Sequence, residues 1–169
     1  TLAVPVPATA QSGLTFTTAP VLQLRDSVGN PLAQSGVTIV ASLASGAGGN
    51  LRGTLQVPTD AAGQATFGNL NLFGPIGSYT LRFAGNAAST IDTLVATPTT
   101  LAAGTAAKLL LGTAPAAAAQ NNVPLAQQPA VTVADSANNP VLVAGTQVTV
   151  AVATGAPALV GTVTVPTSA

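Results

Sequence analysis

The sequence predicts an all-β protein built from antiparallel β-sandwich repeats, the second of which is incomplete. One stretch, PVLQLRDSVGNPL at residues 20–32, returns 109 residues later as PAVTVADSANNPVL at residues 129–142. Short alternating segments follow one another at a spacing of roughly 8 to 12 residues, with turn residues between them, which is typical of a sandwich. No segment has the periodicity of an amphipathic helix. Repetition at the length of a domain therefore indicates a modular chain.

The first unit is expected to hold about seven strands. Residues 1–6 alternate, but Pro5 and Pro7 confine them to an edge strand or an extended lead-in. Further strands are expected over residues 21–25, 37–43, 54–57, 64–72 with a kink at Gly68, 79–83 and 91–96. The Gly-rich residues 45–50 are expected to form a loop. Tyr79 begins its strand where sandwiches often place a structural corner tyrosine.

The second unit follows the first in its core positions. Ile39, Ala41 and Leu43 correspond to Val148, Val150 and Val152, and residues 53–59 correspond to residues 161–167 after one deletion. Nothing in residues 110–169 corresponds to residues 63–96, so the second unit is predicted to lack its last three strands. We therefore expect a complete sandwich over residues 1–100, a linker or junction strand over 101–109, and a partial repeat over 110–169 with an open apolar face.

Both copies of the repeated stretch place polar turn residues between two strands. Asp, Asn and Pro side chains favour turns because they bond the local backbone or fix its conformation. We expect structural turn roles for Asp26, Asn30, Pro31, Asp60, Gly63, Asp135, Asn139 and Pro140.

Composition excludes several classes of function. The chain has four basic and four acidic residues, only 5% charged residues, and a mean hydropathy of +0.54. A nucleic-acid partner is excluded because no basic patch is available, and an uncharged surface of this kind tends to associate. No run approaches the roughly 20 apolar residues that cross a bilayer, so no membrane insertion is expected. The chain starts at Thr1 without a leader, as expected of a mature form or part of a longer protein.

Catalytic and cofactor-binding residues are not predicted anywhere in the chain. His, Cys and Glu are absent, which removes the usual nucleophile and base pairs. A calcium site needs six to eight oxygen ligands, usually from several carboxylates. Asp26, Asp92 and Asp135 are weak calcium candidates that offer one carboxylate each, so no metal site or cofactor is expected.

Three stretches carry a resemblance to a known family. They are LQLRDSVGNPLAQSGVTI in the first unit, VTVADSANNPVLVAGTQVTV in the second, and the pair TDAAGQATF and GSYTLRF. Together they resemble the bacterial immunoglobulin-like (Big) tandem repeats of the invasin and intimin type. The resemblance implies an immunoglobulin-like sandwich, a place on the bacterial cell surface, and a rod-like stack of domains that in some members ends in an adhesive tip.

These observations predict a non-enzymatic structural module of an extracellular bacterial fibre. Its partners would be other copies of itself or further repeats of the same chain, with strand addition from a neighbouring copy completing the second unit. The expected assembly strands contain Thr1, Leu2, Ala3 and Val4, and Val148, Val150, Val152, Val163 and Val165. An adhesin segment that binds a host protein or glycan is the alternative. It predicts an exposed aromatic cluster or a polar pocket in the loops, whereas aromatic residues make up 3% of the chain and lie mostly in predicted strands.

Overall fold

The computed structural model describes residues 1–46, 48–85, 93–155 and 158–168. Every regular element in these residues is a β-strand, as predicted. The chain divides into two compact units, Thr1–Gly104 and Thr105–Ala169, and the boundary falls within the predicted linker at residues 101–109. The described chain contains no long apolar helix of the kind that spans a bilayer.

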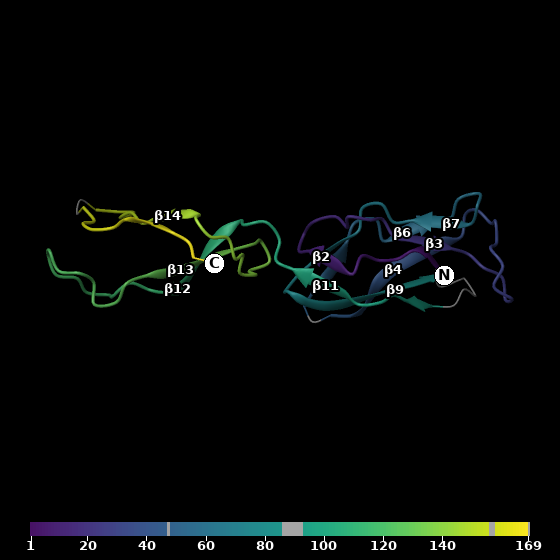
Figure 1. Cartoon of the computed structure of the whole chain (residues 1–169), viewed down its shortest axis with the longest axis horizontal. Coiled ribbons are helices and arrows are strands. Elements are labelled where there is room, and N and C mark those ends of the chain that lie inside the picture. The colour runs from purple at the N-terminus through teal and green to yellow at the C-terminus, as the bar shows by residue number, and fades with distance from the viewer. Residues whose placement is uncertain (47, 86–92, 156–157, 169) are drawn as a thin grey trace. The chain divides into compact units, whose positions relative to one another are not determined.

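The first sheet of the first unit has three antiparallel strands. It contains β1 (Leu2–Val4), β3 (Val21–Gln23) and β7 (Gln64–Thr66), with β3 in the middle. Figure 1 labels β3 and β7 in this unit. Side chains alternate across these strands, so Leu22 and Ala65 point toward the core.

The second sheet of the first unit has six strands. Its order is β2 (Thr9–Gln11), β11 (Thr99–Ala102), β9 (Gly77–Gly85), β4 (Thr38–Ser45) and β6 (Gln56–Pro58), and β10 (Leu94–Val95) also pairs with β9. All these pairs are antiparallel except β2 with β11, which is parallel. A further pair is formed by β5 (Asn50–Arg52) and β8 (Asn71–Phe73).

The core of the first unit contains side chains from both sheets. Phe67 and Phe83 pack with their ring centroids 5.3 Å apart, and Leu70, Leu72 and Leu81 are fully buried beside them. Burial of one large apolar side chain contributes about 1.5–3 kcal/mol, so this cluster supplies much of the stability of the unit.

Several predicted element bounds are corrected by the structure. Residues 64–72 form two strands, β7 and β8, because each pairs with a different partner, and β4 and β5 extend into the predicted Gly-rich loop. The first residues of the predicted linker belong to β11, where Leu101 is buried. Of the strand expected over residues 91–96, the first two residues lie outside the described chain, and β10 covers Leu94–Val95.

The lead strand predicted for assembly is not unpaired. β1 pairs with β3 through Leu2↔Leu22 and Val4↔Val21, and the Thr1 amino group donates to the Gln23 carbonyl at 3.0 Å. A neighbouring copy could receive Thr1, Leu2, Ala3 and Val4 only after these bonds had been broken. The strand is therefore not free in the folded chain, and its part in assembly stays a prediction.

The second unit consists, in its described residues, of two separate strand pairs. β12 (Lys108–Thr113) pairs with β13 (Ala130–Ala134), and β14 (Gln147–Thr149) pairs with β15 (Thr164–Pro166). The first pair reproduces β1–β3, with Leu111↔Val131 and Thr113↔Ala130 at the same offset and with the same irregularity of register. The second reproduces β4–β6, since Val148↔Val165 corresponds to Ile39↔Val57.

Candidate functional site

The turn at Asp26 is held together by its carboxylate. Oδ1 accepts hydrogen bonds from the backbone N–H groups of Val28 at 3.0 Å and Asn30 at 2.8 Å, and Oδ2 accepts from Asn30 Nδ2 at 3.0 Å. The pKa of Asp26 is lowered, chiefly by the backbone hydrogen bond from Asn30 and then by its side chain. An ionised carboxylate is the better acceptor, so these bonds favour the charged form.

The turn at Asp135 makes the same bonds in the second unit. Its Oδ1 accepts from the N–H groups of Ala137 and Asn139, and its Oδ2 accepts from Asn139 Nδ2, each at 2.8 Å. Each turn is closed by a bridge to its proline, Arg25↔Pro31 in one unit and Ala134↔Pro140 in the other. The copies differ in exposure, because Asp26 is exposed whereas Asp135 and Asn139 are buried.

The turn at Asp60 has a related form. Oδ1 accepts from the N–H groups of Ala62 and Gln64, each at 2.9 Å. In all three turns the residue three places after the Asp has a positive φ. The value is +90° at Gly29 after Asp26, +76° at Gly63 after Asp60, and +69° at Asn138 after Asp135. The three turns share a geometry that the sequence marks by an Asp followed three residues later by Gly or Asn.

The structure describes two of the three calcium candidates, and each of these carboxylates bonds its own turn. No group of three or more His, Cys, Asp or Glu that could hold a metal occurs among the described residues. Asp26 and Asp135 lie in different units and bond their own turns. Asp92 lies outside the residues that the structure describes.

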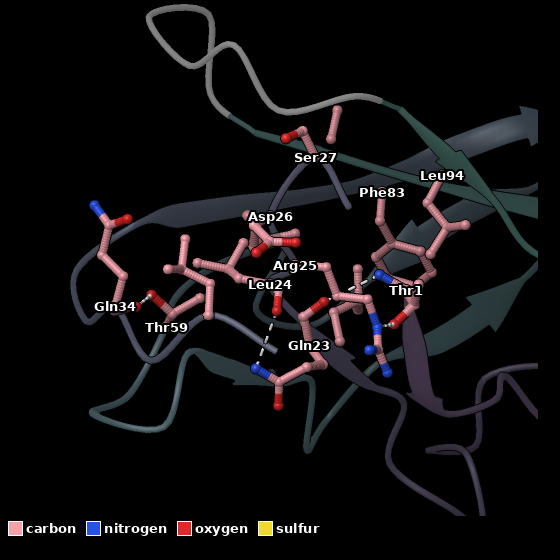
Figure 2. A pocket seen from close by; sticks show the side chains of 14 residues that line it. Thr1, Gln23, Leu24, Arg25, Asp26, Ser27, Gln34, Thr59, Phe83 and Leu94 are labelled. Atoms are coloured by element: carbon pink, nitrogen blue, oxygen red, sulfur yellow. Dashed lines mark hydrogen bonds between the residues drawn. The ribbon is translucent and has the colours of Figure 1, made fainter. Parts of the chain in front are cut away.

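An open hollow of about 630 Å³ lies at one end of the first unit, between β3 and the β4–β9–β10 side (Figure 2). Its floor is apolar and includes Ile39, Phe83 and Leu94. Its polar rim is already bonded: Arg25 donates to Thr1 Oγ1 at 2.8 Å, and Thr59 Oγ1 donates to the Gln34 carbonyl at 2.7 Å. These bonds tie polar residues of the lining to one another.

Tyr79 is the corner tyrosine that the sequence predicts. It is buried, its hydroxyl donates to the Pro75 carbonyl at 2.7 Å, and burial raises its pKa. The Gly-rich loop packs on its ring, because a Cβ at Gly46 or at Gly49 would lie only 2.1 Å from ring carbons. The ring and the loop therefore fix each other.

The candidate site is an apolar surface of the second unit, which we call the open face. It is defined by Val131 of the β12–β13 pair and by Val148, Val150, Val152 and Val165 in and beside the β14–β15 pair, and of these Val148 is half-buried and the other four are exposed. These residues stand at the repeat positions of Leu22, Ile39, Ala41, Leu43 and Val57, all of which belong to or pack against the core of the first unit. Val131 is 41% exposed where Leu22 is 7% exposed, and Val150 is 47% exposed where Ala41 is 2% exposed.

The open face is exposed because its strands, β13 and β14, have fewer neighbouring strands than β3 and β4, the corresponding strands of the first unit. β3 lies between β1 and β7, and β4 lies between β9 and β6. In the described part of the second unit, β13 pairs only with β12 and β14 only with β15. A row of apolar side chains beside an unpaired strand edge is a surface that another strand can cover.

The predicted assembly residues of the second unit lie on or beside this site, but only some of them are in strands. Val148 and Val165 lie in β14 and β15. Val150, Val152 and Val163 fall outside the strands, although the Val150 N–H still donates to the Val163 carbonyl at 2.9 Å. β4 continues to Ser45 because β9 pairs with it along its length, whereas β14 ends at Thr149.

Sequence reasoning missed the β12 strand and the parallel β2–β11 pair. The signal for β12 is present in the sequence, because Leu111 follows Leu2 by the repeat offset of 109 residues. The parallel pair leaves no local signal, since it depends on where the chain crosses between sheets.

The facing sheets, the core between them and the corner tyrosine define the first unit as an immunoglobulin-like β-sandwich. Residues 5–98 match the family described as SMCHD1 Ig-like domain 6, and the chain belongs to this family of immunoglobulin-like domains. No curated protein matches the chain. The predicted all-β, immunoglobulin-like fold is thus confirmed, and it makes the chain a structural or interaction module.

Proposed function

We propose that this chain is a non-enzymatic structural module of an extracellular bacterial fibre made of tandem immunoglobulin-like units. The observation that carries the proposal is the physical repeat. The β1–β3 pairing, the Asp turn and the β4–β6 pairing of the first unit all recur in the second unit at nearly one offset. A chain that repeats these pairings and this turn in succession is organised as tandem units, as fibre-forming proteins are.

The surface chemistry supports the same proposal. Charged residues make up 5% of the chain, about a fifth of the usual share in soluble proteins. Such a surface associates with similar surfaces through apolar contacts and backbone hydrogen bonds. The partners in this proposal are other copies of the protein or further repeats of the same chain.

The bacterial assignment and the surface location rest on sequence motifs. The stretches around Asp26 and Asp135, with TDAAGQATF and GSYTLRF, resemble invasin- and intimin-type repeats, whose members form rods on bacterial surfaces. The hydrogen bonds of the Asp turns give these motifs a structural reason, because each motif fixes the connection between two strands.

Immunogold electron microscopy of intact cells that naturally make the protein tests this proposal. Antibodies against the purified chain should label extended fibres on the outer surface without permeabilisation. An antibody against a protein confined to the cell interior serves as the control that the cells are intact. Labelling that appears only after the cells are permeabilised would contradict the proposal.

A further inference from the structure

The first unit contains one parallel pair among the strand pairs that the structure describes. β2 and β11 pair from Thr9↔Thr100 to Gln11↔Ala102, and every other described pair of strands is antiparallel. β2 lies near the start of the unit, and β11 ends just before its boundary at Gly104. The first and last strands of the larger sheet are therefore bonded directly to each other (Figure 1).

The direction of the two strands decides how this pair carries tension along the chain. Tension enters β2 at its N-terminal end and leaves β11 at its C-terminal end, and in parallel strands these are opposite ends of the pair. The load therefore runs along the strands and acts on all of their hydrogen bonds at once. In an antiparallel pair the same two points would lie at one end, and the bonds would break one after another.

Backbone hydrogen bonds hold the pair at both of its ends. Near the start of β2, the Thr100 N–H donates to the Ala8 carbonyl at 2.9 Å. Just after the end of β2, the Ser12 N–H donates to the Ala102 carbonyl at 3.0 Å. Tension along the strands must therefore break bonds over the whole length of the pair.

Thr99 adds a side-chain hydrogen bond to this pair. Its hydroxyl donates to the Pro7 carbonyl at 2.8 Å, and the residue is completely buried. Its neighbour Thr100 is exposed, because side chains alternate along a strand. The Thr99 bond joins β11 to the segment just before β2, so it must break before β2 can slide.

We propose that the first unit bears tension along the chain, and that the β2–β11 pair, strengthened by the Thr99 hydroxyl, is the contact that resists it. β1 comes before this pair in the path of the load. It has three residues and an irregular register with β3, so it should yield first. The inference goes beyond the proposed function, because it assigns a mechanical role to the unit that is independent of where the protein is found.

Single-molecule pulling on the full chain tests the inference, because a chain without cysteine accepts handles at chosen exposed positions. Pro5→Cys with Thr105→Cys loads the pair along its strands, since Pro5 lies between β1 and β2. Gln11→Cys with Thr105→Cys loads it from one end, since both handles lie at the C-terminal ends of the strands. Residues 106–169 lie outside the loaded path in both cases. At the same loading rate, the first pair of handles should give a several-fold higher unfolding force.

Two threonine variants test the part played by Thr99. Thr99→Val removes the hydroxyl but keeps the shape of the side chain, and Thr100→Val is the matched exposed control. With handles at 5 and 105, Thr99→Val should raise the unfolding rate at constant force several-fold, whereas Thr100→Val should leave it unchanged. With handles at 11 and 105 neither variant should change the rate, because Pro7 then lies outside the loaded path.

Equal unfolding forces for the two pairs of handles would overturn the inference. So would an equal effect of Thr99→Val with both pairs, because the bond would then contribute to stability without resisting the load. The comparison of handles uses exposed positions alone, so it decides the matter also where Thr99→Val fails to fold. The force measurement does not depend on where the protein is found, so it can fail while surface labelling succeeds, and the reverse.

Discussion

Two glycines at equivalent places in their turns should respond very differently to the same substitution. Gly29 and Gly63 each stand three residues after an Asp and have φ values of +90° and +76°. A Cβ at Gly29 would meet nothing within 4 Å, whereas a Cβ at Gly63 would lie 1.9 Å from the Leu32 carbonyl oxygen. The two alanine variants therefore separate backbone strain from steric collision.

The magnitudes follow from these contacts. A positive φ costs an L-residue about 1–2 kcal/mol, which both variants bear. Overpacking against the backbone adds about 1–3 kcal/mol at Gly63, because Leu32 must move to admit the methyl group. Gly29→Ala should cost about 1 kcal/mol and Gly63→Ala about 3 kcal/mol or more. Gly29→Asn should cost less than Gly29→Ala, since Asn138 adopts φ +69° in the equivalent turn.

Urea unfolding followed by tyrosine fluorescence measures these losses in the full chain. Tyr79 is the only tyrosine, the chain has no tryptophan, and Tyr79 lies in the first unit, so the signal reports on that unit. The free energy of unfolding is obtained from the midpoint and slope of the transition. Equal losses for Gly29→Ala and Gly63→Ala would refute the packing of the Asp60 turn against Leu32.

Three further predictions concern single side chains. Tyr79→Phe removes the bond to the Pro75 carbonyl and should lower the free energy of unfolding by about 0.5–1.5 kcal/mol, measured by circular dichroism; an unchanged value would show that the corner bond contributes nothing. The pKa of Asp26 is lower in the folded chain, so its stabilisation is present above the unfolded value of 3.8 and is lost as the pH falls through the folded value. Urea titrations should therefore show that Asp26→Asn is less stable than the natural chain at neutral pH, and that this difference in free energy of unfolding shrinks in acid. A difference that grows in acid would contradict the assigned direction of the pKa shift. Leu22→Ala should lower the free energy of unfolding of the first unit by about 2–5 kcal/mol, whereas Val131→Ala at the matched exposed position should lower that of the second unit by under about 1 kcal/mol. Hydrogen exchange in each unit measures both losses, and similar losses would argue against an open face.

The sequence was most informative where a structure is local. The Asp turns could be predicted because the carboxylate bonds backbone groups two and four residues further on, within one stretch of sequence. The core face of β4 could be predicted because Ile39 and Ala41 alternate with residues that point away from the core. Tyr79 could be predicted from its place at the start of a strand.

The sequence was least informative where a structure depends on distant partners. β1 looked unpaired because its partner, β3, is separated from it by β2, which joins the other sheet. β7 and β8 looked like one strand because their different partners leave no mark on residues 64–72. The exposure of the open face depends on which strands are beside it, which alternation alone does not specify.

Amide hydrogen exchange at one pair of residues gives the most direct test of the account. It asks whether the two units make the same backbone hydrogen bonds but differ in whether a further strand covers them. Ala41 and Val150 donate corresponding hydrogen bonds, to the carbonyls of Leu55 and Val163. In the isolated chain the Val150 amide should exchange much faster than that of Ala41. Equal and strong protection of both amides without any added strand would contradict the account.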